Sequence, residues 1–284
     1  MTQEHRDSAY SSSAYILGRT DGERTRLGIQ ASILNPLTER FLLAVGISPG
    51  MRLLDIGSGI GDVALIAARL VGPDGEVVGI DVDPGVVGIA SERAREEGVR
   101  QVAFECSNIA SYNPRRGFDA VLGRHVLIHT PDPLSTVRKA ASLLTDGGIA
   151  AFEEYDLSFW PAGYPAVTLA ANLQWAIVEA FRHVIPHANI GMQVPCLMRQ
   201  AGLEQVRAQS ECLIDAGPDS LFCPWLAETV RSAFPAMEKV GVAAVAGDIE
   251  TLAPRLREQV KSAGASLTSP LIVRSFGRKA RKQD

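Results

Sequence analysis

Residues 53–62 read LLDIGSGIGD, and this stretch decides the fold of the chain. The apolar run Met51–Ile56 that leads into it is typical of a buried parallel strand. The apolar segment Asp62–Val71 that follows predicts a helix. Gly57, Gly59 and Gly61 allow the backbone between them to turn sharply and to approach a ligand without a Cβ in the way. The stretch therefore predicts a strand, a glycine-rich turn and a helix, which together open an α/β fold.

The alternation of strand and helix continues from this stretch toward the C-terminus. Helices are expected at 84–97, where Asp83 can cap the first turn, and at 133–144, which Gly147-Gly148 should end. Such alternation predicts a parallel sheet with helices on both faces. The further strands of this sheet are expected at Glu76–Ile80, Val102–Cys106, Phe118–Gly123 and Ile149–Glu154.

Helical segments flank this core on both sides. Residues 15–45 read as helical, and Asn35-Pro36 should break or restart that helix. The chain is expected to divide into a tail and helical lid (1–45), an α/β core (46–155) and a helical cap with the last sheet strands (156–284). In the cap, helices are expected at 165–184, 194–201, 224–240 and 248–264, and strands at 203–213 and 271–276.

Composition limits the classes of partner. The chain has 284 residues and a net charge of −4, so it lacks the basic field that would hold phosphate backbones, and nucleic acid is a poor candidate. No apolar run is long enough to span a bilayer, and the N-terminus lacks the basic-then-apolar order of a signal peptide. The cysteines are scattered without a Cys-x-x-Cys pair, which favours a reduced, cytoplasmic protein without a metal cluster.

The spacing of the glycines indicates the class of ligand. A dinucleotide loop has the spacing Gly-x-Gly-x-x-Gly and seats a pyrophosphate on the helix N-terminus. Here the glycines are evenly spaced, and Asp62 starts the helix, where its carboxylate would repel a pyrophosphate. S-adenosylmethionine fits better, because it has no phosphate and carries a cationic amino group that acids near the loop can receive. Asp81 ends the second strand, where an acid can accept the two ribose hydroxyls.

Taken together, these residues resemble the class I S-adenosylmethionine-dependent methyltransferases. The similarity extends to Phe118-Asp119-Ala120-Val121 and to residues 143–148, LLTDGG; residues 15–19, YILGR, and the long insert resemble a bacterial small-molecule subgroup. The resemblance implies a Rossmann-like class I methyltransferase fold with a mostly parallel seven-stranded sheet, an N-terminal helical lid and helical cap insertions. It also implies S-adenosyl-L-methionine as the cofactor and S-adenosyl-L-homocysteine as the product.

The resemblance assigns cofactor contacts residue by residue. The glycine loop would hold the methionine portion, Asp81 the ribose, and the apolar residue after it the adenine. Asn108 stands where the family more often has the aspartate that binds the adenine amino group. The backbone of Arg124 would lie beside the sulfonium, and Tyr15 would either cover the cofactor or only staple a helix. The expected cofactor-binding residues are Tyr15, Asp55, Gly57, Ser58, Gly59, Asp81, Val82, Asn108, Ile109 and Arg124.

Candidates for the chemistry follow the fourth and fifth strands. Methyl transfer from a sulfonium mainly needs alignment and exclusion of water, with a base only where the nucleophile must lose a proton. His125 has a side chain suited to act as that base, and local packing is the equal alternative. Glu154 is expected to face the substrate, as a base or as a binder of a substrate cation; the alternative is a solvated strand end.

The sequence thus predicts an enzyme that methylates a small organic molecule. Oxygen is favoured over carbon or nitrogen because His125 could deprotonate a hydroxyl, and the substrate could be a natural product or a lipid-like metabolite. The expected partner is that small molecule, without nucleic acid or membrane, and a homo-oligomer is left open. Two alternatives also remain open: a cyclase or rearrangement enzyme that keeps the cofactor, and a non-catalytic cofactor-binding module. Asp62 disfavours a nicotinamide dehydrogenase.

Overall fold

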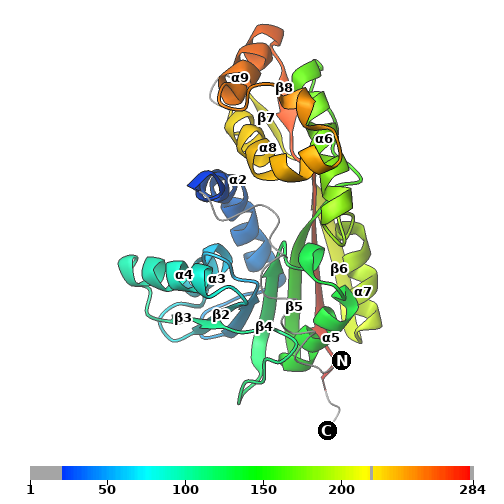
Figure 1. Cartoon of the computed structure of the whole chain (residues 1–284). Helices are drawn as coiled ribbons and strands as arrows, with labels where there is room; N and C mark the ends of the chain where they lie inside the picture. Colours follow the sequence, from blue (N-terminus) through cyan, green and yellow to red (C-terminus); the bar gives the residue numbers. More distant parts are fainter. Residues whose placement is uncertain (1–20, 218–219, 282–284) are drawn as a thin grey trace, which may run out of the picture. The chain divides into compact units, whose positions relative to one another are not determined.

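The computed structural model describes residues 21–217 and 220–281 (Figure 1). The chain divides into two compact units, a sheet unit and a helical unit. The sheet unit comprises Leu34–Glu154, Ile190–Gln209 and the chain from Val273 on. The helical unit comprises the chain up to Ile33, Tyr155–Asn189 and Ser210–Ile272.

A seven-stranded sheet forms the centre of the sheet unit, in the order β3-β2-β1-β4-β5-β9-β6. The pairs β1–β2, β1–β4, β2–β3 and β4–β5 are parallel, which confirms the predicted mostly parallel sheet. The strand order reverses between β1 and β4, where open α/β sheets bind ligands. The strands are β1 (Arg52–Ile56), β2 (Glu76–Asp81), β3 (Val102–Cys106), β4 (Phe118–Arg124), β5 (Leu144–Asp156), β6 (Leu203–Glu211) and β9 (Leu271–Lys279).

Helices cover this sheet because their apolar sides need burial. In α3 (Asp62–Val71), Val63, Ala64 and Ile66 belong to the same buried cluster as Leu53 of β1. Asp83 caps the next helix as predicted, since its side chain accepts a hydrogen bond from the amide of Gly85 at 2.8 Å. The other helices of this unit are α4 (Pro84–Glu96), α5 (Pro133–Leu143), α7 (Val194–Gln200) and the single turns η2 (Leu127–His129) and η3 (Gly191–Gln193).

The first described helix, α2 (Asp21–Val45), runs without a break through Pro36. The expectation that Asn35-Pro36 breaks this helix is therefore wrong. Proline leaves the carbonyl of Ser32 without its helical donor, which costs about 3 kcal/mol. The next turns offset that cost, because Leu37 and Phe41 are buried and each such side chain stabilises by about 1.5–3 kcal/mol.

The start of β5 also differs from the prediction. Helix α5 ends at Leu143, and Leu144 already pairs with Phe118 of β4. The register then shifts before the pair Ala120–Ile149, and Gly147-Gly148 lie in this irregularity rather than ending the helix. A Cβ on Gly148 would lie 2.9 Å from the carbonyl oxygen of Thr145, so the tight bend itself requires glycine.

The helical unit is built on α6 (Thr168–Val184), α8 (Phe222–Lys239), α9 (Leu252–Ala263) and the turn η4 (Ala243–Ala246). In its core, the ring of Trp225 lies 5.8 Å from that of Trp160 and 5.9 Å from that of Phe222. Sequence analysis missed the short antiparallel pair β7 (Ile214–Ala216) and β8 (Ser266–Thr268), because three residues are too few to show a period. None of the helices in the described part of the chain is long and apolar enough to cross a bilayer.

Candidate functional site

The glycine loop between β1 and α3 adopts a conformation that glycine favours. Gly57, Gly59 and Gly61 have φ values of 63°, 52° and 89°. At Gly57 space is limiting as well, because a Cβ there would lie 2.7 Å from Cγ2 of Val126. The loop is also tied to β2, since the amide of Ser58 donates to the carbonyl of Ile80 at 3.0 Å. The loop is therefore tied to β2 at Ser58 and has no room for a side chain at Gly57.

Asp81, at the end of β2, holds this loop through its carboxylate. Oδ2 accepts a hydrogen bond from the amide of Gly59 at 2.9 Å, and Oδ1 accepts one from the amide of Asp83 at 3.0 Å. Each carboxylate oxygen can accept more than one hydrogen bond, and Asp81 is only half-buried. Its neighbour Val82 is 54% exposed, so an apolar side chain lies open to solvent beside the acid.

Asn108 and Ile109 follow β3 and are both half-buried. The Oδ1 atom of Asn108 accepts a hydrogen bond from the amide of Ala110 at 2.9 Å, which closes a local turn. The Oδ1 atom that was expected to bind the adenine amino group therefore already accepts one hydrogen bond within the protein.

Four charged side chains cross one face of the sheet on four adjacent strands. They are Asp55 on β1, Arg124 on β4, Glu153 on β5 and Arg274 on β9, and we call them the charged row. Asp55 pairs with Leu122 and Arg124 with Glu153, so the alternation of side chains puts all of these on one face. Glu153 also forms an ion pair with Arg274. The charges alternate along the row; Asp55, Glu153 and Arg274 are buried, and the side chain of Arg124 is 9% exposed.

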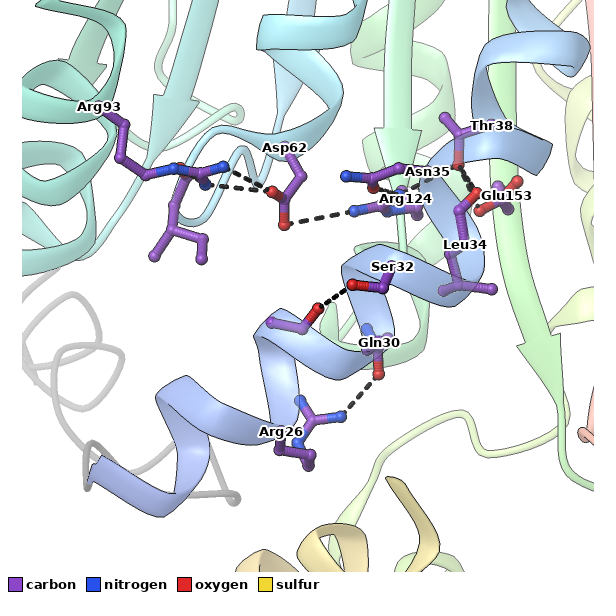
Figure 2. Close-up of polar contacts among 12 residues, drawn as sticks. Arg26, Gln30, Ser32, Leu34, Asn35, Thr38, Asp62, Arg93, Arg124 and Glu153 are labelled. Atoms are coloured by element: carbon purple, nitrogen blue, oxygen red, sulfur yellow. Dashed lines mark hydrogen bonds and ion pairs between the residues drawn. The ribbon is translucent and has the colours of Figure 1, made fainter. Parts of the chain in front are cut away.

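Helices α2 and α3 hold the middle of this row (Figure 2). The Nη1 atom of Arg124 donates to Oδ1 of Asn35 at 2.9 Å and to Oγ1 of Thr38 at 3.1 Å. The hydroxyl of Thr38 also lies 3.0 Å from Oε1 of Glu153. The guanidinium of Arg124 is thus held by protein groups.

Asp62, the first residue of α3, lies between two arginines. Its Oδ1 atom accepts two hydrogen bonds from Arg93 at 3.1 Å, and its Oδ2 atom lies 3.6 Å from Nη2 of Arg124. These cations balance its charge, so Asp62 would repel a pyrophosphate less than its position in the sequence indicates. The case against a dinucleotide therefore depends more on the spacing of the glycines.

Asp55 and Ser58 have buried oxygen atoms without a partner. Among the described residues, neither Oδ2 of Asp55 nor Oγ of Ser58 has a hydrogen-bond partner. Burial raises the pKa of Asp55 from 3.8 to about 7, against the lowering effect of Arg124 and of the amide of Ala64. A buried acid with an unused oxygen beside a glycine loop is suited to accept a cationic hydrogen-bond donor.

Glu154 was expected either to face the substrate or to lie at a solvated strand end, and its carboxylate instead contacts backbone amides. Its side chain is fully buried, and Oε1 accepts hydrogen bonds from the amides of Val126 at 2.9 Å and Leu127 at 2.7 Å. Oε2 lies 3.4 Å from the amide of Ile128. Burial raises the pKa of Glu154 from 4.5 to about 8, and the three amides oppose that shift. The reason is local: the first amides of a helical turn need an acceptor, and this carboxylate supplies it.

His125 directly follows β4 with a φ of 54°, which is uncommon for a residue with a side chain. Its amide donates to the carbonyl of Glu153 at 2.8 Å, and Glu154 holds the amides just after it. These bonds maintain the left-handed conformation and fix His125 at the carboxyl end of the sheet. Tyr15, the remaining expected site residue, lies outside the described residues.

Comparison with known proteins gives a consistent assignment. Residues 47–202 match a family model described as a methyltransferase domain. The chain is 34% identical over 128 residues to the aklanonic acid methyltransferase DauC of Streptomyces sp. (strain C5), across 45% of this chain and 57% of that protein. It is 36% identical over 117 residues to a ubiquinone biosynthesis O-methyltransferase of Xanthomonas campestris pv. campestris (strain B100), across 40% of this chain and 47% of that protein. The matches thus span about half of the length of these relatives.

A solved structure supports the same fold. The crystal structure of the [4+2]-cyclase SpnF matches 87% of this chain and 81% of its own, with a TM-score of 0.55 and 23% sequence identity. At this identity the likeness concerns the fold alone.

Proposed function

Because this chain belongs to the methyltransferase-domain family, with S-adenosyl-L-methionine as its cofactor, we propose that it methylates a small organic molecule. The observation that carries the proposal is a pair of buried oxygens, Asp55 Oδ2 and Ser58 Oγ, which have no hydrogen-bond partner among the described residues and lie at a glycine loop that Asp81 holds in place. Buried polar atoms are costly unless they gain a hydrogen bond, so these two favour a polar ligand at this loop.

The residues present fit the cofactor. We assign the ammonium of its methionine portion to Asp55, and its ribose hydroxyls to the lone pairs that Asp81 has left over. Val82 offers an exposed apolar surface to the adenine. When bound, the cofactor would supply a methyl group on a sulfonium, which needs no further activation by the protein. The other residues assigned to this site are Tyr15, Gly57, Ser58, Gly59, Asn108, Ile109 and the backbone of Arg124.

For the acceptor atom we propose an oxygen. His125 is fixed at the carboxyl end of β4, where its imidazole can take the proton from a hydroxyl as the oxygen becomes a nucleophile. The similarity to an O-methyltransferase of Xanthomonas supports the same choice. The likeness to SpnF concerns the fold, so it does not favour a cyclase. Glu154 is assigned no contact with substrate, since its carboxylate is occupied by backbone amides.

Calorimetry with S-adenosyl-L-homocysteine tests the cofactor site. We expect clear binding by the wild type and a loss of roughly 1.5–3 kcal/mol in Asp81→Ala, since charged hydrogen bonds to the ribose are removed. Asp74→Ala is the matched control, because Asp74 is exposed in the turn before β2. No binding by the wild type would overturn the proposal, and unchanged affinity in Asp81→Ala would remove that residue from the site.

Transfer of a ¹³C-labelled methyl group tests the acceptor atom. A panel of phenols, carboxylic acids and amines should give O-methyl products, and His125→Ala should abolish them while cofactor binding persists. Labelling of amines alone would contradict the choice of oxygen.

A further inference from the structure

We propose that Arg124, held in place by Asn35 and Thr38 of α2, is a positioning residue that keeps Asp55 ionised for the ammonium of the cofactor. This rests on the proposed function. It adds that the affinity for the cofactor is set partly from α2, a helix outside the glycine loop. The charged row would then affect the affinity for the cofactor as well as the stability of the fold.

The order of the charged row is the first argument. Glu153 has Arg274 on one side and Thr38 on the other, and Arg124 contacts Thr38 and Asp62. Asp55 ends the row, and its Oδ2 atom is without a partner among the described residues. Of the two acids in the row, Glu153 has a partner for each oxygen, and Asp55, beside the glycine loop, is the one with an unused oxygen among the described residues. A cationic ligand there would continue the alternation of charges.

The surroundings of Asp55 are the second argument. The charged groups that act on it are Arg124 of β4, Asp81 of β2 and Asp62 of α3. Arg124 favours the ionised form of Asp55, whereas burial and the two acids favour the protonated form. A protonated Asp55 would attract an ammonium far less strongly than a carboxylate. Burial has the largest effect on this pKa, and the cation of Arg124, together with the amide of Ala64, opposes it and so increases the ionised fraction near neutral pH.

The contacts of α2 and α4 are the third argument. Asn35 and Thr38 lie one turn apart on the same side of α2, and both accept from the same nitrogen of Arg124. Arg93 of α4 meanwhile donates two hydrogen bonds to Asp62. Because Arg93 already balances part of the charge of Asp62, Asp62 neutralises the cation of Arg124 only in part. The α2 side chains thus hold the guanidinium over the row, between Asp62 and Glu153.

The test is the pH dependence of S-adenosyl-L-homocysteine binding, measured by calorimetry from about two units below to about two units above pH 7. Wild-type affinity should rise with pH, with a midpoint near the pKa of Asp55, about 7. In Arg124→Met the midpoint should move up by about one unit, so affinity at pH 7 should fall about fivefold and recover at higher pH. Arg124→Lys should bring the midpoint of the pH dependence back close to the wild-type value, because lysine keeps the positive charge.

Two further variants complete the experiment. Thr38→Val keeps the shape of the side chain and removes one acceptor, so the midpoint should shift in the same direction but less. Arg69→Met is the control, because Arg69 is a half-exposed side chain of α3 outside the row. A lower affinity in Arg124→Met with an unchanged midpoint would overturn the positioning role, and if that variant does not fold, an unchanged midpoint in Thr38→Val would do so. Absence of binding by the wild type at every pH would overturn the proposed function as well.

Discussion

Two buried acids toward the carboxyl edge of the same sheet, Asp55 on β1 and Glu154 on β5, differ in what their oxygens contact. Burial raises both pKa values, to about 7 and about 8. The carboxylate of Glu154 accepts from the amides of residues 126–128, whereas one oxygen of Asp55 has no partner in the part of the chain that the structure describes. A raised pKa is therefore common to both, and the unused oxygen distinguishes them. We interpret Glu154 as the support of the turn after β4 and Asp55 as the acceptor for a ligand.

The largest effect is expected from Glu154→Ala. The substitution leaves buried amides without an acceptor, and each costs about 1–3 kcal/mol, so the free energy of unfolding should fall by about 3 kcal/mol or more. Glu154→Gln keeps an oxygen acceptor and should lose only about 1 kcal/mol. Denaturant unfolding measures both values. Equal losses would mean that the charge of Glu154 matters, and not its role as an acceptor.

A smaller loss is expected from Gly57→Ala. A left-handed φ costs an alanine roughly 1–2 kcal/mol, and the added Cβ would also meet Val126 at 2.7 Å. Gly59→Ala is the matched control, because Gly59 has a similar φ but nothing within 4 Å of its Cβ position. Gly57→Ala should therefore unfold at lower denaturant than Gly59→Ala. Identical unfolding curves would show that Val126 does not hold the loop.

Unlike the substitutions at Glu154 and Gly57, Asp55→Asn should raise the free energy of unfolding at high pH. The pKa of Asp55 is raised to about 7 in the folded chain from the ordinary value of 3.8 for an aspartate, so between these pH values the folded state binds more protons. Wild-type stability should therefore fall as pH rises through this interval because of Asp55. Asp55→Asn lacks that loss and should exceed the wild type by about 1 kcal/mol or more above pH 7, with little difference below pH 4. Thermal melts across pH measure this, and a variant less stable at high pH would contradict it.

The smallest effect is expected from Asn108→Asp. The Oδ1 atom of Asn108 already accepts from Ala110, so the asparagine has no second oxygen for a ligand. An aspartate could keep that turn and offer a free oxygen to the adenine amino group. S-adenosyl-L-homocysteine should then bind about threefold to tenfold more tightly, as one added hydrogen bond predicts. Weaker binding would show that this position does not face the adenine.

The sequence predicts the parts of this molecule whose signals are local. The strand, glycine loop and helix at residues 51–71 follow from short-range pattern, as does the cap at Asp83. Pro36 led to the wrong prediction of a helix break. The burial of Leu37 and Phe41 that offsets the cost of the proline depends on residues distant in the chain, which a local pattern does not show.

The charged row could not be predicted in the same way. Arg124, Glu153 and Arg274 are far apart in the sequence and meet only through strand register. Asn35 and Thr38 carry no signal of their own, since their role depends on the guanidinium that they receive. Glu154 was expected to face the substrate, but the register puts Glu153 on the face of Asp55 and Arg124 and Glu154 on the other face. Alternation alone does not say which of two adjacent acids takes which face.

The most direct test of the account is whether Asp55 recognises the ammonium of the cofactor. Calorimetry would compare S-adenosyl-L-homocysteine with its analogue lacking the amino group, on the wild type and on Asp55→Asn, as a double-mutant cycle. The wild type should bind the analogue at least about tenfold more weakly, whereas Asp55→Asn should distinguish the two ligands little. Equal discrimination by both proteins would contradict the assignment of the ammonium to Asp55.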